Sequence, residues 1–454
     1  MKKLRFLFAL WVGKLICKAV DIIDKERGTN IAGIYACRIQ KDFIRHFTGI
    51  DLNKVFFITG TNGKSTTNNM VVHTLRESGK TVTSNLEGAN LLTGVAVALI
   101  RDASLFGKLK SDFFVFETDE RYLAKIHEYL PAKNLCITNI QKDQVQRNGE
   151  PDYIYQKIKP VISKDMTVFV NNEEPRASSM ASFAGNAVYY GIERNDFSFE
   201  KNDFFDVSLP CPVCGDKINF DYYNAENVGH FKCSSCAHAS KTDIDYFAKD
   251  INFEQGTFSC AGDTFKVHNT EPFFIYNYTL CIAICKTLGI ENEQIKKAFD
   301  NFKNITGRKE TIYYKSKVIK YIRIKQENPE TLQTALEYIA GDKSPKLFLL
   351  GLEEIRDINP FYTNTFYAFD CNINRLIASN VERYICFSDA VSYDSANRLI
   401  YAGVDKDKIT ILPTDATEDI MKELDKHDID NVYLITWMHK YHQMDKYAKE
   451  HGNE

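Results

Sequence analysis

The sequence has no excess of positive charge and no apolar run long enough to cross a membrane. Lysine and arginine number 57 against 60 aspartate and glutamate residues, which leaves a net charge of -3. Because the phosphate backbone of a nucleic acid selects basic patches, this balance argues against nucleic acid as the main partner. There is also no internal repeat and no low-complexity segment. The 454 residues, 44% of them hydrophobic and 26% charged, are typical of a globular chain of two or three domains.

The N-terminus resembles a targeting segment but lacks two of its features. Its basic start leads into the apolar stretch Phe6–Gly13, which is far shorter than the ~20 residues of a membrane span. Lys14 and Lys18 then interrupt the apolar run, and no small-residue cleavage site follows. We therefore expect an amphipathic helix, which either packs against its own domain or rests on the membrane surface.

Only four of the twelve cysteines share a regular spacing. Cys211-Pro-Val-Cys214 and Cys233-Ser-Ser-Cys236 form the pattern C-x2-C-x18-C-x2-C, which is typical of a zinc ribbon. Four thiolates close a tetrahedral site with no open position, so we expect structural zinc rather than catalysis. A redox dithiol and an iron–sulfur site are the alternatives.

The other eight cysteines are scattered, and we expect them to be buried small hydrophobes in a chain of the reducing cytosol. His230 and His238 lie near the four-cysteine pattern, and we expect neither to be a ligand. The segment has few lysines and no arginine, which argues against nucleic-acid binding by the ribbon.

The stretch FITGTNGKSTT resembles a phosphate-binding loop but lacks one of its glycines. The common pattern requires a glycine five residues before Gly63, and that position is Ile58. The apolar run Val55–Thr59 precedes the loop, and a helical stretch from about Ser65 to Ser78 follows it, which is the context that such a loop needs. Backbone N–H groups can then cradle phosphate oxygens at a helix N-terminus. The candidate nucleotide-binding residues of this loop are Gly60, Thr61, Asn62, Gly63, Lys64, Ser65 and Thr66.

Two side chains of the loop and a nearby acidic cluster indicate magnesium-assisted phosphate chemistry. Lys64, which we expect to be an exposed loop lysine, would reach the outer phosphates, and the Ser65 hydroxyl would ligate Mg²⁺. In the stretch FVFETDE, three acids follow a strand, and Glu117 at the strand end is our choice for a carboxylate that holds the same ion. The alternative, that the acids solvate a helix start, applies above all to Asp119 and Glu120.

Apolar runs alternate with helical patterns along the chain, which implies a largely parallel α/β sheet. The expected strands of the first part are Val55–Thr59, Phe113–Glu117, Leu135–Asn139, Thr167–Asn171 and Ala187–Tyr190. Residues 205–240 break the alternation, which resumes through Tyr276–Leu288, and a polar link lies near Asn304–Glu310. A second alternation follows, with strands Val318–Ile324, Lys346–Leu350, Arg383–Phe387 and Val432–Thr436, and helices from Pro329, near Asn372–Ser379 and at Ser392–Ala402.

The motifs follow the order and spacing of the Mur ligase superfamily, which the chain resembles over nearly its whole length. They are TGTNGKST, FETDE, ITNIQKDQVQRNGE (Ile137–Glu150), VNNEEP (Val170–Pro175), the Asn277 of IYNYTL and TGRKE (Thr306–Glu310). These enzymes activate a carboxylate with ATP as an acyl phosphate, which an amine then attacks. The resemblance implies an α/β fold: a Mur-ligase-type central ATPase domain with a parallel sheet at 1–307, a zinc ribbon inserted at 205–240, and a smaller C-terminal α/β domain at 308–454.

Within the superfamily the chain resembles the MurT family. The features that carry this resemblance are RGTN near the N-terminus, SNLEGANLLTG (Ser84–Gly94), DQ in place of the usual DH, and the four-cysteine insert. Members of that family are the ligase subunits of a complex that amidates D-glutamate in the peptidoglycan precursor lipid II. They work with GatD, a glutaminase that supplies ammonia. The resemblance implies a heterodimer with a GatD-like subunit, acting on lipid II or a related cell-wall precursor, in the cytoplasm at the inner face of the membrane.

The resemblance assigns roles residue by residue. Lys64 and Ser65 match the phosphate and magnesium positions, and Glu117 matches the magnesium carboxylate. Asn277 looks like the adenine-side asparagine, and Arg308 resembles the nucleotide-facing arginine at the domain hinge.

Four further positions match the family without giving a complete role. Asp143 matches, but Gln144 stands where most Mur ligases have a metal-binding histidine, as expected for the MurT family. Asp394 and Arg398, in SYDSANRLIYAG, resemble positions of the C-terminal domain to which no role can be assigned.

The resemblance to the family also implies a Cys-His-Asp triad shared between the two subunits, in which the ligase subunit contributes the aspartate. That aspartate usually precedes a S-W-I-W-D run, and the best match here is Asn364-Thr-Phe-Tyr-Ala-Phe-Asp370, so Asn364 takes its place. An asparagine can orient a histidine but cannot balance an imidazolium charge. Asp357, seven residues upstream, is the alternative. Because the family docks its glutaminase at the loop Glu353–Phe369, we expect a 1:1 complex through the C-terminal domain.

Two rival functions stay open. One is a free-standing Mur-type ligase that joins an amino acid or amine to another carboxylate. The other is a non-catalytic nucleotide-binding module that regulates or scaffolds a partner. Intact Lys64, Ser65 and Glu117 argue against the module, whereas the divergence at Asn364 keeps it open.

Overall fold

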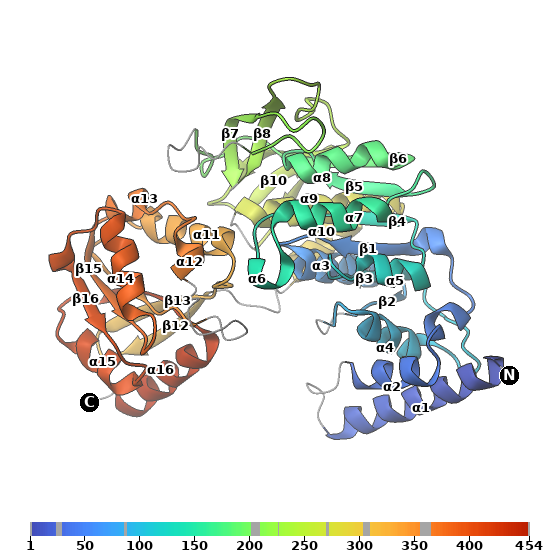
Figure 1. Ribbon diagram of the computed structural model, residues 1–454, viewed down its shortest axis with the longest axis horizontal. Helices are drawn as coiled ribbons and strands as arrows, with labels where there is room; N and C mark the ends of the chain where they lie inside the picture. The colour runs from blue at the N-terminus through green and yellow to red at the C-terminus, as the bar shows by residue number, and fades with distance from the viewer. Residues whose placement is uncertain are drawn as a thin grey trace. The chain divides into compact units, whose positions relative to one another are not determined.

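The computed structural model describes residues 2–23, 30–85, 89–200, 209–225, 227–268, 272–302, 309–354 and 365–452 (Figure 1). These residues form two compact units. The N-terminal unit comprises the described residues up to 302, except 142–149, and the C-terminal unit comprises 142–149 and the described residues from 309 onward. Both units are α/β structures, which confirms the fold class expected from the sequence.

The N-terminal unit is built on a nine-stranded sheet of order β11-β10-β9-β6-β5-β4-β1-β3-β2. In this order, the seven strands β9, β6, β5, β4, β1, β3 and β2 pair in parallel. β10 and β11 extend the sheet beyond β9 and are antiparallel to their neighbours. The strands β1 and β3 are buried at every position because helices cover both faces of the sheet. The strand bounds are β1 Val55–Thr59, β2 Val82–Thr83, β3 Phe113–Glu117, β4 Asn134–Ile137, β5 Thr167–Asn171, β6 Asn186–Ile192, β9 Tyr246–Asn252, β10 Thr257–Cys260 and β11 Asp263–Lys266.

Helices lie on both faces of this sheet (Figure 1). One face shares its apolar core with α3 (Lys64–Glu77), α9 (Pro272–Thr287) and α10 (Asn292–Asn301). The core of the other face is shared with α1 (Lys2–Ile23), α2 (Ile31–Ile39), α4 (Leu92–Asp102), α5 (Leu123–Tyr129), α7 (Pro151–Ile158) and α8 (Pro175–Ser179). Short 3-10 turns at Phe43–His46, Leu52–Lys54, Lys159–Val161 and Met180–Phe183 complete the unit.

The expected N-terminal helix is present as α1, and one of its faces packs on its own unit. Phe6 and Leu10 are buried in the core shared with α4. The Lys14 ammonium donates to the main-chain oxygen of Ile100 at 2.7 Å and to that of Ala103, so this lysine anchors α1 to the end of α4. No helix in the described part of the chain is long and apolar enough to cross a membrane.

The insert after β6 contains more strands than the sequence predicts. β7 (Ile218–Ala225) and β8 (Val228–Cys233) form a two-stranded hairpin, which is the expected ribbon. β9 then returns to pair with β6, and β10 and β11 extend the sheet beyond it. These three strands were missed because Lys249 and Asp250 interrupt the apolar positions of β9, and because β10 and β11 have only four residues each, which weakens the strand signal.

The C-terminal unit has a six-stranded sheet of order β12-β13-β17-β14-β15-β16. Its strands are parallel except β12, which forms an antiparallel hairpin with β13. The strand bounds are β12 Lys309–Tyr314, β13 Lys317–Ile322, β14 Lys346–Leu350, β15 Val381–Phe387, β16 Ile409–Leu412 and β17 Asn431–Ile435. The helices are α6 Val145–Asn148, α11 Pro329–Gly341, α12 Thr365–Ala368, α13 Asn374–Ile377, α14 Ser392–Tyr401, α15 Thr417–Asp425 and α16 Met438–His451, with a 3-10 turn at Lys406–Lys408.

Three sequence expectations for this unit differ from the structure. β12 begins at Lys309, inside the stretch expected to be a polar link, pairs with β13, and buries Ile312 and Tyr314 in the core of the unit. β16 was not expected, because its four residues are too few for a clear period. The helix expected near Asn372–Ser379 is reduced to the single turn α13.

Glu173 is a buried carboxyl group that links β6 to the hairpin β7–β8. Its Oε2 accepts the Ile192 N–H at 2.9 Å, its Oε1 accepts the Asn172 side-chain amide at 3.4 Å, and its main-chain oxygen accepts the Gly229 N–H at 2.9 Å. A Cβ atom at Gly191 would lie 2.2 Å from Glu173 Oε1, so a larger residue there would displace the carboxyl group. Burial raises the pKa of Glu173 from its ordinary 4.5 to about 7.

We predict that Glu173→Gln removes one component of the pH dependence of stability. The folded chain keeps a proton at Glu173 that the unfolded chain releases, so the free energy of unfolding falls as the pH rises from about 4.5 to about 7, by about 3 kcal/mol. Denaturant unfolding of both proteins near pH 5 and near pH 8 measures this difference. The variant should gain stability relative to the wild type at the higher pH. An identical pH dependence in the two proteins would contradict the prediction.

Candidate functional site

The loop between β1 and α3 has the geometry of an anion-binding turn. β1 ends at Thr59 and α3 begins at Lys64, with Gly63 as the residue before the helix. Gly60 and Gly63 adopt φ angles of 125° and 86°, in the region that favours glycine. A Cβ atom at Gly60 would lie 2.3 Å from Thr138 Oγ1, so only glycine fits there. The expected strand, loop and helix are therefore present, and the N-terminus of α3 can receive an anion.

A second turn, at the end of β4, holds this loop in place. Asn139 accepts the Thr61 N–H at its main-chain oxygen (2.8 Å) and the Asn62 N–H at Oδ1 (2.9 Å). Gln141 donates its N–H to Thr61 Oγ1 (2.9 Å) and accepts the Asn62 side-chain amide at Oε1 (3.1 Å). Asn139 and Gln141 were not among the predicted site residues. Their place directly after β4, the parallel neighbour of β1, was the signal that could have found them.

Lys64 is buried and paired, not exposed as expected from the sequence. Its Nζ donates to the main-chain oxygens of Gly60 and Thr61, the latter at 3.1 Å, and forms an ion pair with Glu120 Oε2 at 3.1 Å. The side chains of Lys64 and Glu120 are only 10% and 5% exposed. Glu120 therefore does not solvate a helix start. Because a buried charge is costly without a partner, the two side chains depend on each other.

Glu117 and Ser65 lie at the same edge of the sheet, because Glu117 ends β3 and Ser65 lies at the start of the helix that follows the adjacent strand β1. Glu117 is the last residue of β3 and is buried, whereas Ser65 is exposed in the first turn of α3. Asn85 fixes the end of β3, because its Oδ1 accepts the Glu117 N–H (3.0 Å) and its Nδ2 donates to the main-chain oxygen of Glu117 (2.9 Å). Asp119 pairs with Arg121 at 3.3 Å. A hydroxyl and a carboxylate at one sheet edge are the donors that Mg²⁺ prefers.

Asn277 lies on α9 against the start of α3. Its Oδ1 accepts the Thr67 hydroxyl at 3.3 Å and would lie 2.4 Å from a Cβ atom at Gly63. Its Nδ2 is buried and has no hydrogen-bond partner among the residues that the structure describes. An unsatisfied buried amide costs free energy, which a ligand acceptor would recover. Asn277 is therefore in a position to contact a ligand of the loop, and its adenine-side role stays a prediction.

Three predicted site residues, Arg308, Asp357 and Asn364, lie outside the described residues. Most of the loop Glu353–Phe369, predicted to dock a glutaminase, lies outside them too. The nucleotide-facing role of Arg308 and the triad roles of the other two residues therefore stay predictions.

Asp143 and Gln144 belong to the C-terminal unit and contact the start of α11. Asp143 Oδ1 accepts the Asn328 side-chain amide at 3.0 Å, and Lys325 Nζ lies 3.6 Å from Asp143 Oδ2. The Gln144 N–H donates to the main-chain oxygen of Glu327 at 2.9 Å. Gln144 adopts φ 45°, a left-handed conformation at the start of α6. These two residues thus tie the segment 142–149 to α11.

Arg398 is a buried side chain that stabilises the C-terminal unit, a role that the sequence did not predict. It is almost fully buried, and its guanidinium donates to the main-chain oxygens of Ala368 (2.8 Å) and Cys371 (2.6 Å). It therefore holds the end of α12 against α14. Asp394, one turn earlier, is exposed.

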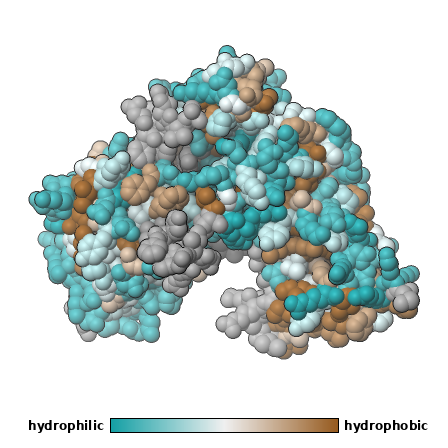
Figure 2. All heavy atoms as spheres, in the orientation of Figure 1, coloured by the Kyte–Doolittle hydropathy of each residue, from teal (hydrophilic) through white to brown (hydrophobic). Residues whose placement is uncertain are grey.

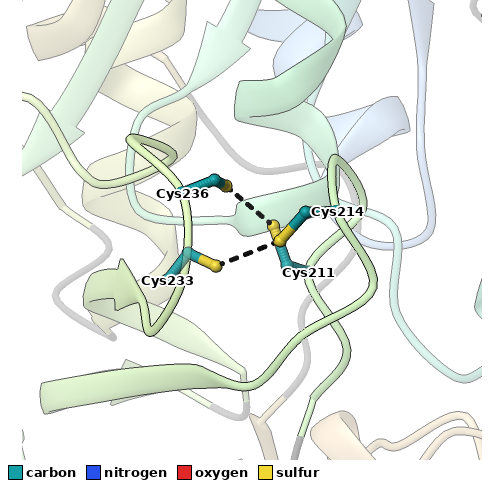
Figure 3. A group of neighbouring side chains, drawn as sticks. All are labelled: Cys211, Cys214, Cys233 and Cys236. Carbon is teal, nitrogen blue, oxygen red and sulfur yellow. Dashed lines mark hydrogen bonds between the residues drawn. The ribbon is translucent and has the colours of Figure 1, made fainter.

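The four cysteines of the ribbon converge on one point (Figure 3). Cys211 Sγ lies 3.7 Å from Cys236 Sγ, Cys214 Sγ lies 3.4 Å from Cys233 Sγ, and all four atoms lie within 4.8 Å of one another. A tetrahedron with Zn–S bonds of about 2.3 Å has edges of about 3.8 Å, so this donor set fits Zn²⁺. The Ser235 N–H donates to Cys233 Sγ at 3.4 Å and is the largest cause that lowers the pKa of that thiol, whereas the pKa values of the other three thiols are raised. The fit to zinc therefore rests on the geometry of the four sulfur atoms.

The neighbouring histidines have other partners. His230 Nδ1 lies 2.7 Å from a carboxylate oxygen of Asp221, and His238 Nε2 lies 2.9 Å from the main-chain oxygen of Pro175. Of the eight cysteines outside the ribbon, seven are buried, as expected, and Cys37 is partly exposed.

A cavity of about 480 Å³ lies at the carboxyl ends of the parallel strands of the C-terminal unit. Glu353, Asp389, Asp415 and Trp437, from the segments that follow β14, β15, β16 and β17, line it together with Lys440. Burial raises the pKa of Asp415 and lowers the pKa of Lys440. This edge of an open α/β sheet is where ligands commonly bind, and the sequence did not predict the cavity.

Comparison with known protein families shows which family this chain belongs to. The Mur ligase middle domain family matches residues 58–285, and the MurT ligase C-terminal family matches residues 326–442. The chain belongs to the MurT ligase family. This MurT-family chain is therefore an ATP-dependent ligase of the Mur type, and the resemblance drawn from its sequence motifs is confirmed.

Relatives of this MurT-family chain are similar over most of its length. It is 27% identical over 387 residues (83% of this chain and 84% of the relative) to the Staphylococcus aureus (strain COL) protein named lipid II isoglutaminyl synthase (glutamine-hydrolyzing) subunit MurT. The protein of the same name from Streptococcus pneumoniae is 26% identical over 417 residues, or 90% of each chain.

Solved Mur ligase structures show the same fold. A pseudomurein peptide ligase type C from Methanothermus fervidus aligns with a TM-score of 0.62 at 19% identity, covering 90% of this chain and 80% of that one. MurF ligase from Thermotoga maritima aligns with a TM-score of 0.60 at 15% identity, covering 92% and 84%. The loop of Gly60–Thr66 thus lies in the middle domain of a Mur ligase fold.

We predict that Lys64→Ala destabilises this MurT-family chain by about 3 kcal/mol, because it leaves the buried Glu120 without its cation. The matched control is the double variant Lys64→Ala/Glu120→Gln, which removes both charges and should recover most of the loss. Denaturant unfolding of the three proteins measures the effect. Equal stability of the wild type and the single variant would show that the ion pair does not stabilise the fold.

Proposed function

We propose that this chain is the ligase subunit of a lipid II isoglutaminyl synthase, which converts the α-carboxylate of the D-glutamate residue in lipid II to an amide. The observation that carries the proposal is the combination of two parts in one chain. A phosphate loop with Lys64, Ser65 and Glu117 at one sheet edge is followed by a C-terminal domain of the MurT type. Relatives with this name are similar over 83% and 90% of the chain.

The reaction proceeds in two transfers. A carboxylate oxygen of the acceptor attacks the γ-phosphorus of ATP, which forms an acyl phosphate and releases ADP. The nitrogen of ammonia then attacks the acyl carbon, phosphate leaves, and a proton is lost from nitrogen. In most analyses charge spreads over the transferred phosphoryl group, so cations and N–H donors positioned around it supply most of the catalysis.

The residues of the loop have separate roles in this proposal. Backbone N–H groups of Gly60–Thr66 would hold the phosphates. Lys64 would exchange hydrogen bonds to the loop oxygens for contacts with the outer phosphates. Ser65 and Glu117 would hold Mg²⁺, which would offset the negative charge of the phosphate oxygens. Asn277 and Arg308 contact the nucleotide. The unsatisfied amide of Asn277 and the sheet-edge placement of Ser65 and Glu117 support these roles.

A glutaminase partner supplies the ammonia in this proposal. Free ammonia is largely ammonium at neutral pH, and ammonium is a poor nucleophile, so direct transfer from a partner favours the reaction. The names of the relatives describe a glutamine-hydrolysing synthase of which they are one subunit. We therefore infer a 1:1 heterodimer with a GatD-like subunit, docked on the C-terminal domain. The lipid-linked acceptor places the reaction in the cytoplasm at the inner face of the membrane.

The test of this function is a reconstituted amidation assay with lipid II, ATP and Mg²⁺, read by mass spectrometry of the product. The chain alone should form the amide with added ammonium salt, and the heterodimer should form it with glutamine. Lys64→Ala/Glu120→Gln should lower ATP-dependent product formation at least a hundredfold while staying folded, because it removes the phosphate contact. ATP consumption with a different carboxylate, and none with lipid II, would favour a free-standing ligase. No turnover at all would favour the non-catalytic module.

The same assay locates the shared triad residue. If Asp357 completes the partner's triad, Asp357→Asn should lower glutamine-dependent activity strongly but spare activity with ammonium. If Asn364 holds that position, Asp357→Asn should have little effect and Asn364→Asp should raise glutaminase activity. Equal loss with both nitrogen sources would place Asp357 in the ligase site or in folding. No effect of either residue on glutamine use would exclude a shared triad in this protein.

We also propose that the ribbon holds one structural zinc ion through Cys211, Cys214, Cys233 and Cys236. Metal analysis of the purified chain should find zinc at one ion per chain, and Cys233→Ser should lose it. Loss of the metal should reduce the order of the hairpin β7–β8 more than that of the main sheet, because the hairpin is an insertion. Hydrogen exchange measures this difference. Stoichiometric iron with visible absorbance, or no metal, would contradict the proposal.

A further inference from the structure

The helix α1 has apolar side chains on two opposite faces. Phe6, Leu10 and Cys17 point into the core. On the opposite side, five exposed apolar side chains recur at spacings of four, three, four and seven residues, so they follow one line along a helix of 3.6 residues per turn. We call this line the outer stripe, and it comprises Leu4, Phe8, Trp11, Leu15 and Ile22. The space-filling view shows brown surface along α1 (Figure 2).

A loop beside α1 continues the outer stripe. The indole N–H of Trp11 donates to the main-chain oxygen of Leu105 at 2.9 Å, so the loop after α4 lies against the helix. Leu105 and Phe106 are 62% and 76% exposed, which is unusual for side chains of this size. The apolar surface therefore spans two elements that are far apart in the sequence.

Basic side chains flank this apolar surface. α1 carries five lysines and arginines and one acid, a net charge of +4 over 22 residues, whereas the whole chain has a net charge of -3. Lys2, Lys3 and Lys18 are exposed on α1, and Lys108 and Lys110 are exposed just after Phe106. The acid of α1, Asp21, pairs with Arg101 at 2.9 Å, so it does not cancel these lysines. The apolar surface thus has exposed lysines at the N-terminal end of α1, one turn after Leu15, and in the loop after Phe106.

We propose that the outer stripe and the loop Leu105–Phe106 bind the surface of an anionic lipid bilayer. The apolar side chains would enter the boundary between headgroups and acyl chains, and the flanking lysines would contact the headgroup phosphates. The chemistry favours lipid over protein, because protein interfaces are depleted in lysine, whereas a lysine-rich amphipathic helix with a tryptophan is typical of a membrane interface. Since α1 cannot cross a membrane, the helix lies in the plane of the surface. The inference does not depend on which carboxylate is amidated.

The first test is sedimentation of the full chain with vesicles of phosphatidylglycerol and phosphatidylcholine, compared with vesicles of phosphatidylcholine alone. Binding should be at least tenfold stronger to the anionic vesicles and should weaken at high salt. Leu15→Asp and Phe106→Asp should each lower the partition coefficient at least tenfold. Both side chains are exposed, so circular dichroism should show an unchanged fold. The matched control is Tyr313→Asp, since Tyr313 is 74% exposed on β12 in the other unit and should not affect binding.

The second test uses the two tryptophans of the chain, Trp11 and Trp437. In the variant Trp437→Phe, the fluorescence reports Trp11 alone. Its emission should shift to the blue on addition of anionic vesicles, and lipids brominated near the headgroup should quench it. Lys18→Glu should weaken the binding without removing apolar surface, which separates the charge contribution from the hydrophobic one.

Three outcomes would overturn the proposal. Vesicle binding that is unaffected by Leu15→Asp and Phe106→Asp, with no change in Trp11 emission, would exclude this surface. If Leu15→Asp instead converts a dimer to a monomer in light scattering, the outer stripe is an interface between copies of the chain. If the substitution abolishes binding of the purified glutaminase subunit and leaves vesicle binding unchanged, the stripe is a protein docking surface.

Discussion

The candidate nucleotide site depends on the close contact between the glycine loop and the turn after β4. Six hydrogen bonds with Asn139 and Gln141 fix Thr61 and Asn62, and Gly60 has no space for a side chain. Because β4, β1 and β3 are parallel neighbours, their carboxyl ends share one edge of the sheet. That edge brings the loop and Glu117 together from segments about fifty residues apart. The sheet therefore positions the site, and the loop itself needs little stabilisation of its own.

Two buried carboxyl groups of the N-terminal unit are stabilised in different ways. Glu120 forms an ion pair with the ammonium group of Lys64 inside the site. The Glu173 carboxyl group instead accepts hydrogen bonds from the Ile192 N–H and the Asn172 side-chain amide. Burial raises the pKa of Glu173 toward neutral pH. One carboxyl group thus contributes to the electrostatics of the loop, whereas the other joins the inserted hairpin to the sheet.

The parts of the fold that could be predicted from the sequence are those that depend on local pattern. The apolar runs of β1, β3, β5 and β14 were recognised with their correct bounds, and the spacing of the four cysteines indicated a common centre. β12 was missed because it begins inside a polar stretch, and β9 to β11 were missed because charged residues interrupt β9 and because β10 and β11 have only four residues each. The burial of Lys64 and the roles of Asn139 and Gln141 depend on tertiary contacts between distant segments, which local sequence patterns do not show.

The pairing of Lys64 with Glu120 has a consequence for the history of this family. A buried acid is harmful once its cation is gone, so a descendant that gave up catalysis by losing the lysine would be under pressure to replace the acid as well. The two positions should therefore change together when homologous chains are aligned, although they are separated by more than fifty residues. Chains that keep the acid without the lysine should be rare, and an inactive relative should be recognisable from this pair alone.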